Sequence, residues 1–345
     1  MDVRLSPEQR ALRESVIQIV GRFGPRSVRD LDDAERQEKL DAAVEASGWR
    51  ELRAITQTGA PLASAVEVAI VAEELGRSLA DAAFLGPTLA AELRRCSGTT
   101  ARSHETVALT PDLSAVGCVA QGSPWPELVA VDAGGADAAV LVAAPDASRG
   151  VTTAGIGPPG GSVDLTRPSA AVPATDRRTC ASEGGPLAET DLMRWTALGL
   201  VITCADLVGA MRGAIDLATD YAITRRQYGV AVGSFQAVQH LLADALVSME
   251  GSRSVTRYAG WAVDTLSPAD ALAAAGLAKA YCARSARAVC ETAIQVHGGI
   301  GNTWDCLAHV YLRRSLLSID ILGGVGASLS RVLEAKGIGG AGGLR

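Results

Sequence analysis

The hydrophobic periodicity of this 345-residue chain changes twice, and that change limits the possible folds more than any single motif does. In residues 1–104, apolar residues recur at the three- to four-residue steps of amphipathic helices. Residues 105–188 instead contain short apolar runs bounded by glycine, proline and aspartate, which is typical of strands. The helical period returns over 189–335, and a glycine-rich, flexible tail is expected at 336–345. We therefore predict a mainly α-helical protein with a shortened middle β-domain.

Local signals support this division into three parts. Ser6, followed by proline and then by Gln9, has the spacing of a capping box at the start of a helix. A second helix is expected over 65–77, where the apolar positions again follow the helical period. Within the middle part, the apolar runs 128–131 and 138–143 are predicted to be strands. The sequence thus predicts the order helix, β-structure, helix.

Charge and composition exclude several classes of protein. The formal net charge of −6 and the isoelectric point near 5.4 argue against nucleic-acid binding, which needs a basic surface. Hydrophobic residues make up 48% of the chain and aromatic residues only 4%, so we expect a core of alanine, valine and leucine. Charged residues interrupt the apolar stretches, and the first residues lack the apolar region of a signal peptide. We therefore expect neither a membrane span nor secretion.

The cysteines and histidines indicate no metal site. The seven cysteines are scattered and lack CxxC spacing, which is typical of buried free thiols in a reducing cytoplasm. The four histidines lie far apart in the sequence, and only Asp305 and His309 fall at an i, i+4 step. Such a pair is more often a surface pair than a ligand set. We expect a cytoplasmic protein without a metal.

Two ordered segments carry the functional signal. Residues 225–229 read Arg-Arg-Gln-Tyr-Gly and are followed by Gln236, and residues 295–301 read Gln-Val-His-Gly-Gly-Ile-Gly. In this order and spacing they resemble the carboxy-terminal flavin-contacting elements of acyl-CoA dehydrogenases. Further similarities lie at 73–77 in the first helical part, and at 135–142 and 164–168, which look like strands of the middle domain.

The resemblance covers most of the chain and implies a specific architecture. Members of the family have an N-terminal helical domain, a small β-barrel-like domain and a C-terminal four-helix bundle. In this sequence the corresponding boundaries are 1–104, 105–188 and 189–335.

The resemblance also implies a cofactor, flavin adenine dinucleotide (FAD), and a set of residues that contact it. These candidates are Arg225, Tyr228, Gln236, Gln295, Gly298 and Gly299. The pyrophosphate of FAD needs a planar, permanently charged partner such as Arg225, and glycines let the backbone approach the cofactor closely. Each segment taken singly has an ordinary alternative, since arginines often end helices and glycine clusters often form turns.

The catalytic carboxylate of the family is missing at both of its usual positions. Dehydrogenation of an acyl-CoA needs a base for the α-proton, and general-base catalysis contributes roughly 10²–10⁴-fold. In the family this glutamate usually lies 27 residues after the glutamine of the Gln-x-x-Gly-Gly motif, which here leads to Leu322. The other location lies 26 residues before Arg225, at Gly199. Because neither residue can accept a proton, we predict no catalytic residue in this chain.

The middle domain also departs from the family. Members that hold the flavin ring present a Glu-Pro-x-x-Gly-Ser-Asp-like loop and a Trp-Ile-Thr/Ser-like strand. Residues 108–115 read Ala-Leu-Thr-Pro-Asp-Leu-Ser-Ala, a remnant of the first motif, and the second is not found. These elements and the base act in cis, whereas the elements around Arg225 and Gln295 reach the neighbouring subunit's cofactor. The chain has therefore kept the elements used in trans and lost those used in cis.

Three hypotheses follow from this pattern. The first is the base-less subunit of a heterotetrameric acyl-CoA dehydrogenase, as in actinobacterial steroid catabolism, inactive alone and completing the FAD site of a larger catalytic homologue. The second is a self-sufficient homo-oligomer that uses a displaced acid, Asp320 or Asp305. The third is a flavin-free scaffold. For the first two, the expected partners include an acyl-CoA from fatty acid or steroid catabolism and an electron-transfer flavoprotein.

Overall fold

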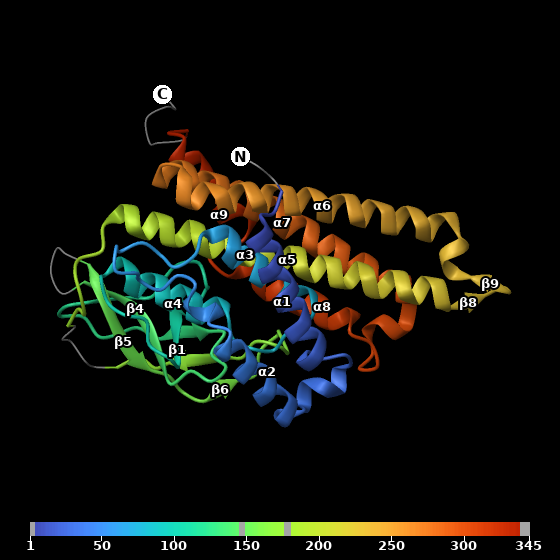
Figure 1. The fold of residues 1–345 in the computed structure, drawn as a ribbon, viewed down its shortest axis with the longest axis horizontal. Helices are drawn as coiled ribbons and strands as arrows, with labels where there is room; N and C mark the ends of the chain where they lie inside the picture. Colours follow the sequence, from blue (N-terminus) through green and yellow to red (C-terminus); the bar gives the residue numbers. More distant parts are fainter. Residues whose placement is uncertain (1–3, 145–148, 176–180, 339–345) are drawn as a thin grey trace.

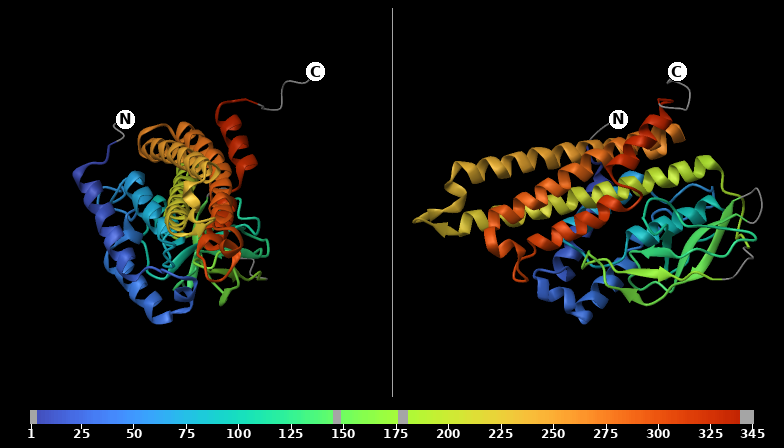
Figure 2. Two further views of the ribbon diagram at one scale, coloured as in Figure 1. Left: turned by 90° about the vertical axis from the view of Figure 1, so that its right-hand side faces the viewer. Right: turned by 180° about the vertical axis from the view of Figure 1, so that it is seen from behind.

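The computed structural model describes residues 4–144, 149–175 and 181–338. It confirms the predicted mainly helical fold with a middle β-region (Figure 1). Cys180 and most of the predicted flexible tail lie outside the described residues. The helical bundle forms one long layer, and the sheet packs beside one half of it, as the two further views in Figure 2 show.

The N-terminal part consists of four α-helices and two short 3₁₀ helices. They are α1 (Pro7–Phe23), η1 (Val28–Asp32), α2 (Ala34–Ala46), η2 (Trp49–Glu51), α3 (Ala65–Arg77) and α4 (Leu85–Cys96). The predicted capping box is confirmed, since Ser6 Oγ accepts a hydrogen bond from the Gln9 backbone N–H at 3.2 Å. Helix α3 has the residue bounds that the sequence predicted, and Ser64 caps its start.

The middle part is a seven-stranded mixed sheet with the strand order β2-β4-β1-β3-β7-β6, in which β5 also pairs with β4. Its strands are β1 (Glu105–Leu109), β2 (Cys118–Ala120), β3 (Leu128–Val131), β4 (Ala138–Ala144), β5 (Gly150–Gly155), β6 (Pro159–Gly160) and β7 (Ser169–Val172). The central strand β4 is parallel to β1, with Val107 opposite Val140. The strands predicted over 128–131 and 138–143 are confirmed.

One predicted strand is wrong. Residues 164–168 form a series of bends before β7. The Asp164 carboxylate accepts hydrogen bonds from the backbone N–H and the hydroxyl of Thr166, at 2.8 and 2.7 Å. Such a local bond gives the backbone an alternative to the sheet ladder, which the apolar pattern does not reveal.

The C-terminal part is a bundle of long helices. Its elements are α5 (Glu189–Thr224), β8 (Arg226–Gln227), β9 (Val230–Ala231), η3 (Val232–Ser234), α6 (Gln236–Thr265), α7 (Pro268–His297), η4 (Gly298–Asn302), α8 (Ala308–Asp320) and α9 (Val325–Ala335). Helix α5 packs against α3, α6, α7 and α8 and is the most buried of them. The β8–β9 hairpin projects beyond the end of the bundle (Figure 1).

Two stretches are long and apolar enough to cross a membrane by length and composition, whereas the sequence predicted none. The first is α5, whose most apolar window is 94% buried inside the protein. The second, Ala308–Ala335, comprises α8 and α9 with the turn at 321–324 between them. Core packing explains the apolar character of α5, and the second stretch is not one continuous helix.

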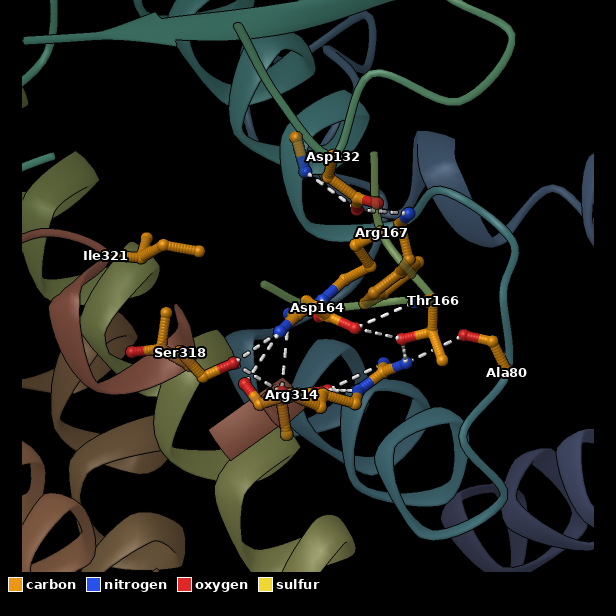
Figure 3. Close-up of polar contacts among 12 residues, drawn as sticks. Ala80, Asp132, Asp164, Thr166, Arg167, Arg314, Ser318 and Ile321 are labelled. Carbon is orange, nitrogen blue, oxygen red and sulfur yellow. Dashed lines mark hydrogen bonds and ion pairs between the residues drawn. The ribbon is translucent and has the colours of Figure 1, made fainter. Parts of the chain in front are cut away.

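A buried ionic cluster joins the three parts of the chain (Figure 3). Asp206 of α5 lies 2.7 Å from an Nη atom of Arg314 on α8 and 3.3 Å from one of Arg167, which precedes β7. Arg167 also pairs with Asp164 at 2.7 Å and donates to Ser318 Oγ at 2.7 Å. Because these side chains are almost fully buried, their mutual pairing compensates the cost of removing charge from water.

Candidate functional site

The two positions at which a catalytic base was sought lie in direct contact. Gly199 is in the first third of α5, and Leu322 is in the turn between α8 and α9. A Cβ atom at position 199 would lie 2.2 Å from Leu322 Cδ1 and 3.5 Å from the nearest Leu89 methyl carbon. Leu322 is only 1% exposed. The place where both positions converge is therefore filled by leucine side chains and holds no proton acceptor from either position.

The loop that resembles the flavin-ring motif rests on this same turn. The Leu322 backbone N–H donates a hydrogen bond to the Leu113 carbonyl at 2.7 Å. Arg331 of α9 bridges both segments, donating to the Leu322 carbonyl at 2.6 Å and to the Ser114 carbonyl at 2.9 Å. Leu113 and Leu322 both have a positive φ, near +60°. Direct hydrogen bonds thus hold the loop of the β-region against the turn of the helical bundle.

A buried lysine forms hydrogen bonds to the backbone at the turn that carries Leu322. Lys279 of α7 is fully buried and donates hydrogen bonds to the carbonyls of Ser318 at 2.5 Å and Ile321 at 2.9 Å. It also donates to Thr203 Oγ1 of α5 at 3.0 Å. Burial lowers the pKa of Lys279 to about 8. Sequence reasoning missed this residue, because a lysine in a helix is usually exposed.

The candidates from the first motif lie at the opposite end of the bundle. Arg225 caps the end of α5, Tyr228 is in the turn of the projecting hairpin, and Gln236 begins α6 (Figure 1). All three are exposed, and Tyr228 is 93% exposed with φ +52°. They are available to a ligand or protein outside this chain.

The second motif ends helix α7 at the same end of the molecule. Gln295, Gly298 and Gly299 are exposed, and Gly298 has φ +64°, a conformation that side chains other than glycine rarely adopt. The rings of Tyr221 and His297 stack with their centroids 4.6 Å apart, and this contact joins the two motifs. The structure thus brings the six predicted residues to one end of the bundle.

His297 is buried at this junction although it belongs to the second motif. Its Nδ1–H donates to the Ala293 carbonyl at 2.7 Å, and the ring is also hydrogen bonded to the Cys306 thiol. Burial lowers the pKa of His297, but these two hydrogen bonds outweigh it and raise the pKa above its usual value. The same contact lowers the pKa of the Cys306 thiol despite its burial. The motif pattern did not single out His297.

The two displaced acids lie in surroundings that differ from those of the two family base positions. Asp320 at the end of α8 and Asp305 in the connection from η4 to α8 are both exposed, whereas Gly199 and Leu322 are buried. Neither acid occupies the position expected of a family base. Among the described residues, no group of three or more histidine, cysteine, aspartate or glutamate side chains could hold a metal ion.

The cysteines fit their prediction only in part. Four of the six in the described ranges, Cys204, Cys282, Cys290 and Cys306, are buried. Cys118, in contrast, is exposed, so the expectation of uniformly buried thiols is wrong for it. Its strand β2 lies at an edge of the sheet, where alternate side chains face solvent.

A large cavity lies away from all of these residues. Its volume is about 620 Å³, and it is between α2 and the glycine-rich turns of the β-region. Five carboxylates are among its lining residues, namely Glu38, Asp41, Glu45, Asp81 and Asp164. None of the six motif residues lines it, so this cavity is separate from the predicted cofactor contacts.

Comparison with known proteins decides the family. A model of the C-terminal domain of acyl-CoA dehydrogenases matches residues 183–335. The chain is 31% identical over 324 residues to the acyl-CoA dehydrogenase IpdE2 of Mycobacterium tuberculosis, covering 92% of this chain and 93% of that protein. The chain belongs to the acyl-CoA dehydrogenase family. An IpdE2 of Mycolicibacterium smegmatis is 28% identical over 336 residues, covering 96% of this chain and 99% of the relative.

Solved structures of the acyl-CoA dehydrogenase fold agree with this assignment. A chain of the ChsE4-ChsE5 complex from Mycobacterium tuberculosis matches with a TM-score of 0.79 and 22% identity, covering 99% of this chain and all of that chain. Butyryl-CoA dehydrogenase from Megasphaera elsdenii matches with a TM-score of 0.77 and 14% identity, covering 97% of this chain and 100% of the other. At these identities the likeness establishes the fold.

Two regions of this chain show how well it fits the family cofactor FAD, namely the two family base positions and the two motif segments. At the two family base positions, Leu322 packs into the space beside Gly199 and its N–H bonds to the Leu113 carbonyl, so neither position offers a proton acceptor. The six motif residues, in contrast, are exposed at one end of the bundle and offer a guanidinium, amides and glycine backbone. The exposed motif residues therefore have the chemistry to hold a pyrophosphate-bearing cofactor, and the two family base positions offer no proton acceptor.

Proposed function

We propose that this chain is the non-catalytic subunit of a heteromeric FAD-dependent acyl-CoA dehydrogenase and completes the cofactor site of a larger catalytic homologue. The observation that carries the proposal is the apolar packing at the two family base positions, where Leu322 fills the space beside Gly199 and its N–H bonds to the Leu113 carbonyl. A chain without a base at either family position still exposes Arg225, Tyr228 and Gln236. Such an exposed surface suits a cofactor held by another subunit.

Each exposed group has a defined task in such a site. The Arg225 guanidinium forms charge-assisted hydrogen bonds with the pyrophosphate, which are roughly twice as strong as neutral ones. Gln236 and Gln295 donate and accept hydrogen bonds with the polar parts of the cofactor. Gly298 and Gly299 leave room for close backbone approach; at neither position would an added Cβ meet an atom of this chain within 4 Å.

The chemistry of acyl-CoA dehydrogenation determines which groups each subunit must supply. When bound, FAD supplies the acceptor for the hydride that leaves the β-carbon of an acyl-CoA thioester. The α-proton needs a carboxylate, and this chain offers Gly199 and Leu322 at the two family positions. The partner therefore supplies the base and the flavin-ring cradle, and this chain supplies cofactor contacts that carry no proton.

Relatives with similar folds support a heteromeric assembly. One matching structure is titled the ChsE4-ChsE5 complex, and another, with a TM-score of 0.79 and 21% identity, is the Tcur3481-Tcur3483 steroid ACAD, covering 96% of this chain and 98% of that one. We accordingly propose a cytoplasmic heterotetramer that acts in fatty acid or steroid catabolism and passes electrons to an electron-transfer flavoprotein.

Co-expression tests the proposal directly. The chain is produced alone, and also together with a larger acyl-CoA dehydrogenase homologue encoded beside it. We expect a colourless isolated chain and a yellow complex with one FAD per pair of unlike subunits. A yellow and active isolated chain would establish the self-sufficient enzyme instead, and absence of flavin under every condition would establish the scaffold.

Arg225→Ala tests the assigned contact within the complex. Loss of the pyrophosphate contact should deplete FAD while the two subunits still co-purify. Arg10→Ala on α1 is the matched control, because it removes the same charge from an exposed helical position. Unchanged flavin stoichiometry in the Arg225 variant overturns the role of this residue.

A further inference from the structure

The ring contact between Tyr221 and His297 links two cofactor-contacting segments that are far apart in the sequence. Tyr221 lies in the last turn of α5, four residues before Arg225, and His297 lies between Gln295 and Gly298. Their ring planes are inclined by 29° at a centroid separation of 4.6 Å. Offset stacking of this kind is a favourable and directional contact. It fixes the end of α5 relative to the end of α7.

Both residues are tied to the helix ends that they join. The Arg225 N–H donates to the Tyr221 carbonyl at 2.8 Å, so Tyr221 is directly connected to the capping residue of α5. The His297 imidazole donates to the Ala293 carbonyl at 2.7 Å, which ties the ring to the backbone one turn earlier in α7. The next residue, Gly298, is the C-cap with positive φ. A shift of either ring is thus transmitted to Arg225 or to Gly298.

We infer that Tyr221 and His297 are positioning residues that hold Arg225 and the Gly298–Gly299 backbone at the spacing required to bind one cofactor jointly. This inference rests on the proposed function. The stack contributes by preorganisation, because it fixes the helix ends that carry an exposed arginine and a glycine backbone and so lowers the cost of ordering them on binding. Tyr221 and His297 do not themselves need to touch the cofactor.

A double-mutant cycle on the complex tests the inference. Tyr221→Ala and His297→Ala are prepared singly and together, and the FAD dissociation constant is measured by flavin fluorescence. Each single variant should weaken FAD binding about three- to tenfold, the range expected for one aromatic pair. The double variant should be no weaker than the worse single variant, because either change already breaks the stack.

Two further variants separate positioning from folding. Tyr221→Phe keeps the ring and should restore FAD affinity to within about twofold of the wild type, since stacking uses the ring. Tyr258→Ala removes a ring from another aromatic pair, Tyr258–Trp261 with centroids 5.8 Å apart on α6, and should leave FAD affinity unchanged. Thermal unfolding and size-exclusion chromatography of every complex establish that it is folded and assembled.

The outcomes distinguish this inference from the proposed function. If Arg225→Ala depletes FAD but both alanine variants of the pair bind it normally, the positioning role is overturned and the shared site stands. Strictly additive losses in the double variant also overturn the positioning role. If Arg225→Ala itself leaves FAD bound, the roles of Arg225 and of its positioning fail together, whereas the proposed function is overturned only by the co-expression experiment.

Discussion

Leu322 occupies the space that any side chain at position 199 would need, because its Cδ1 atom lies 2.2 Å from where a Cβ of residue 199 would be. The two places from which family members draw their base therefore converge in three dimensions although they are far apart in the sequence. In this chain a glycine and a leucine fill that point together. A carboxylate introduced at position 199 would meet the Leu322 side chain, and one introduced at position 322 would be buried in the apolar core beside Gly199.

Leu322→Glu should consequently give no dehydrogenase. The new carboxyl group would be buried in apolar packing near Leu89, and the nearby Lys279 and Arg331 already bond to carbonyls of this turn. We therefore expect a loss of about 3 kcal/mol or more in the free energy of unfolding. Leu322→Met, which nearly conserves volume, should cost less than about 1.5 kcal/mol. Urea denaturation and acyl-CoA-dependent dye reduction measure the two effects. A yellow and active Leu322→Glu subunit would contradict this expectation.

Asp206→Ala should destabilise the protein by roughly 3–5 kcal/mol, because it leaves Arg167 and Arg314 without their shared carboxylate in a buried cluster. The control is Asp216→Ala. Asp216 pairs with Arg77 at 2.8 Å, but both side chains are more than a third exposed, and such pairs contribute about 0–1 kcal/mol. Chemical denaturation at pH 7 should separate the two variants clearly. Equal effects would contradict the importance of burial.

The same aspartate should contribute to acid unfolding. Burial raises its pKa, but Arg167 and Arg314 outweigh that and hold the pKa of Asp206 below its usual value. A lowered folded-state pKa means that the stabilisation is present above the unfolded pKa, about 3.9, and is lost as the pH falls through the lower folded value. The stability difference between wild type and Asp206→Ala should therefore shrink below about pH 4. A constant difference down to pH 2 would contradict this.

Lys279 should make stability rise with pH in the alkaline range. Its pKa in the folded protein is about 8, below the ordinary 10.5, so between these values the unfolded chain binds more protons than the folded one. The free energy of unfolding of the wild type, measured relative to that of Lys279→Met, should then increase by roughly 1.4 kcal/mol per pH unit over this interval. Denaturation curves at pH 7, 8, 9 and 10 test the slope. Parallel pH profiles for the two proteins would exclude a depressed lysine pKa.

Two glycine-to-alanine substitutions should change the stability of the protein in opposite directions. At position 209 in α5 an added Cβ would lie 2.0 Å from the Glu73 carbonyl oxygen in the backbone of α3, which cannot move aside without shifting the helix. We expect Gly209→Ala to cost about 1–3 kcal/mol. Gly21 is exposed in α1 with open space around it, so Gly21→Ala should stabilise the protein by up to about 1 kcal/mol. Thermal unfolding of both variants provides the comparison.

The sequence by itself determined the elements and the family. Helical and strand periodicities are local, so the capping box at Ser6, helix α3 and strands β3 and β4 could be predicted from neighbouring residues. The motif spacing placed the absent base at Leu322 and Gly199. Local reasoning failed at residues 164–168, where side-chain hydrogen bonds to the backbone replaced the expected strand.

Only the tertiary structure decided how the site is arranged. The contact of Gly199 with Leu322, the bond from Leu322 to Leu113 and the stack of Tyr221 on His297 each join residues that are far apart in the sequence. Such contacts depend on how whole helices pack and on which side chains fill the space between them, and periodicity within one element does not encode that choice. The absence of a base could be read from the sequence, but the leucine packing that fills its place required the packed fold.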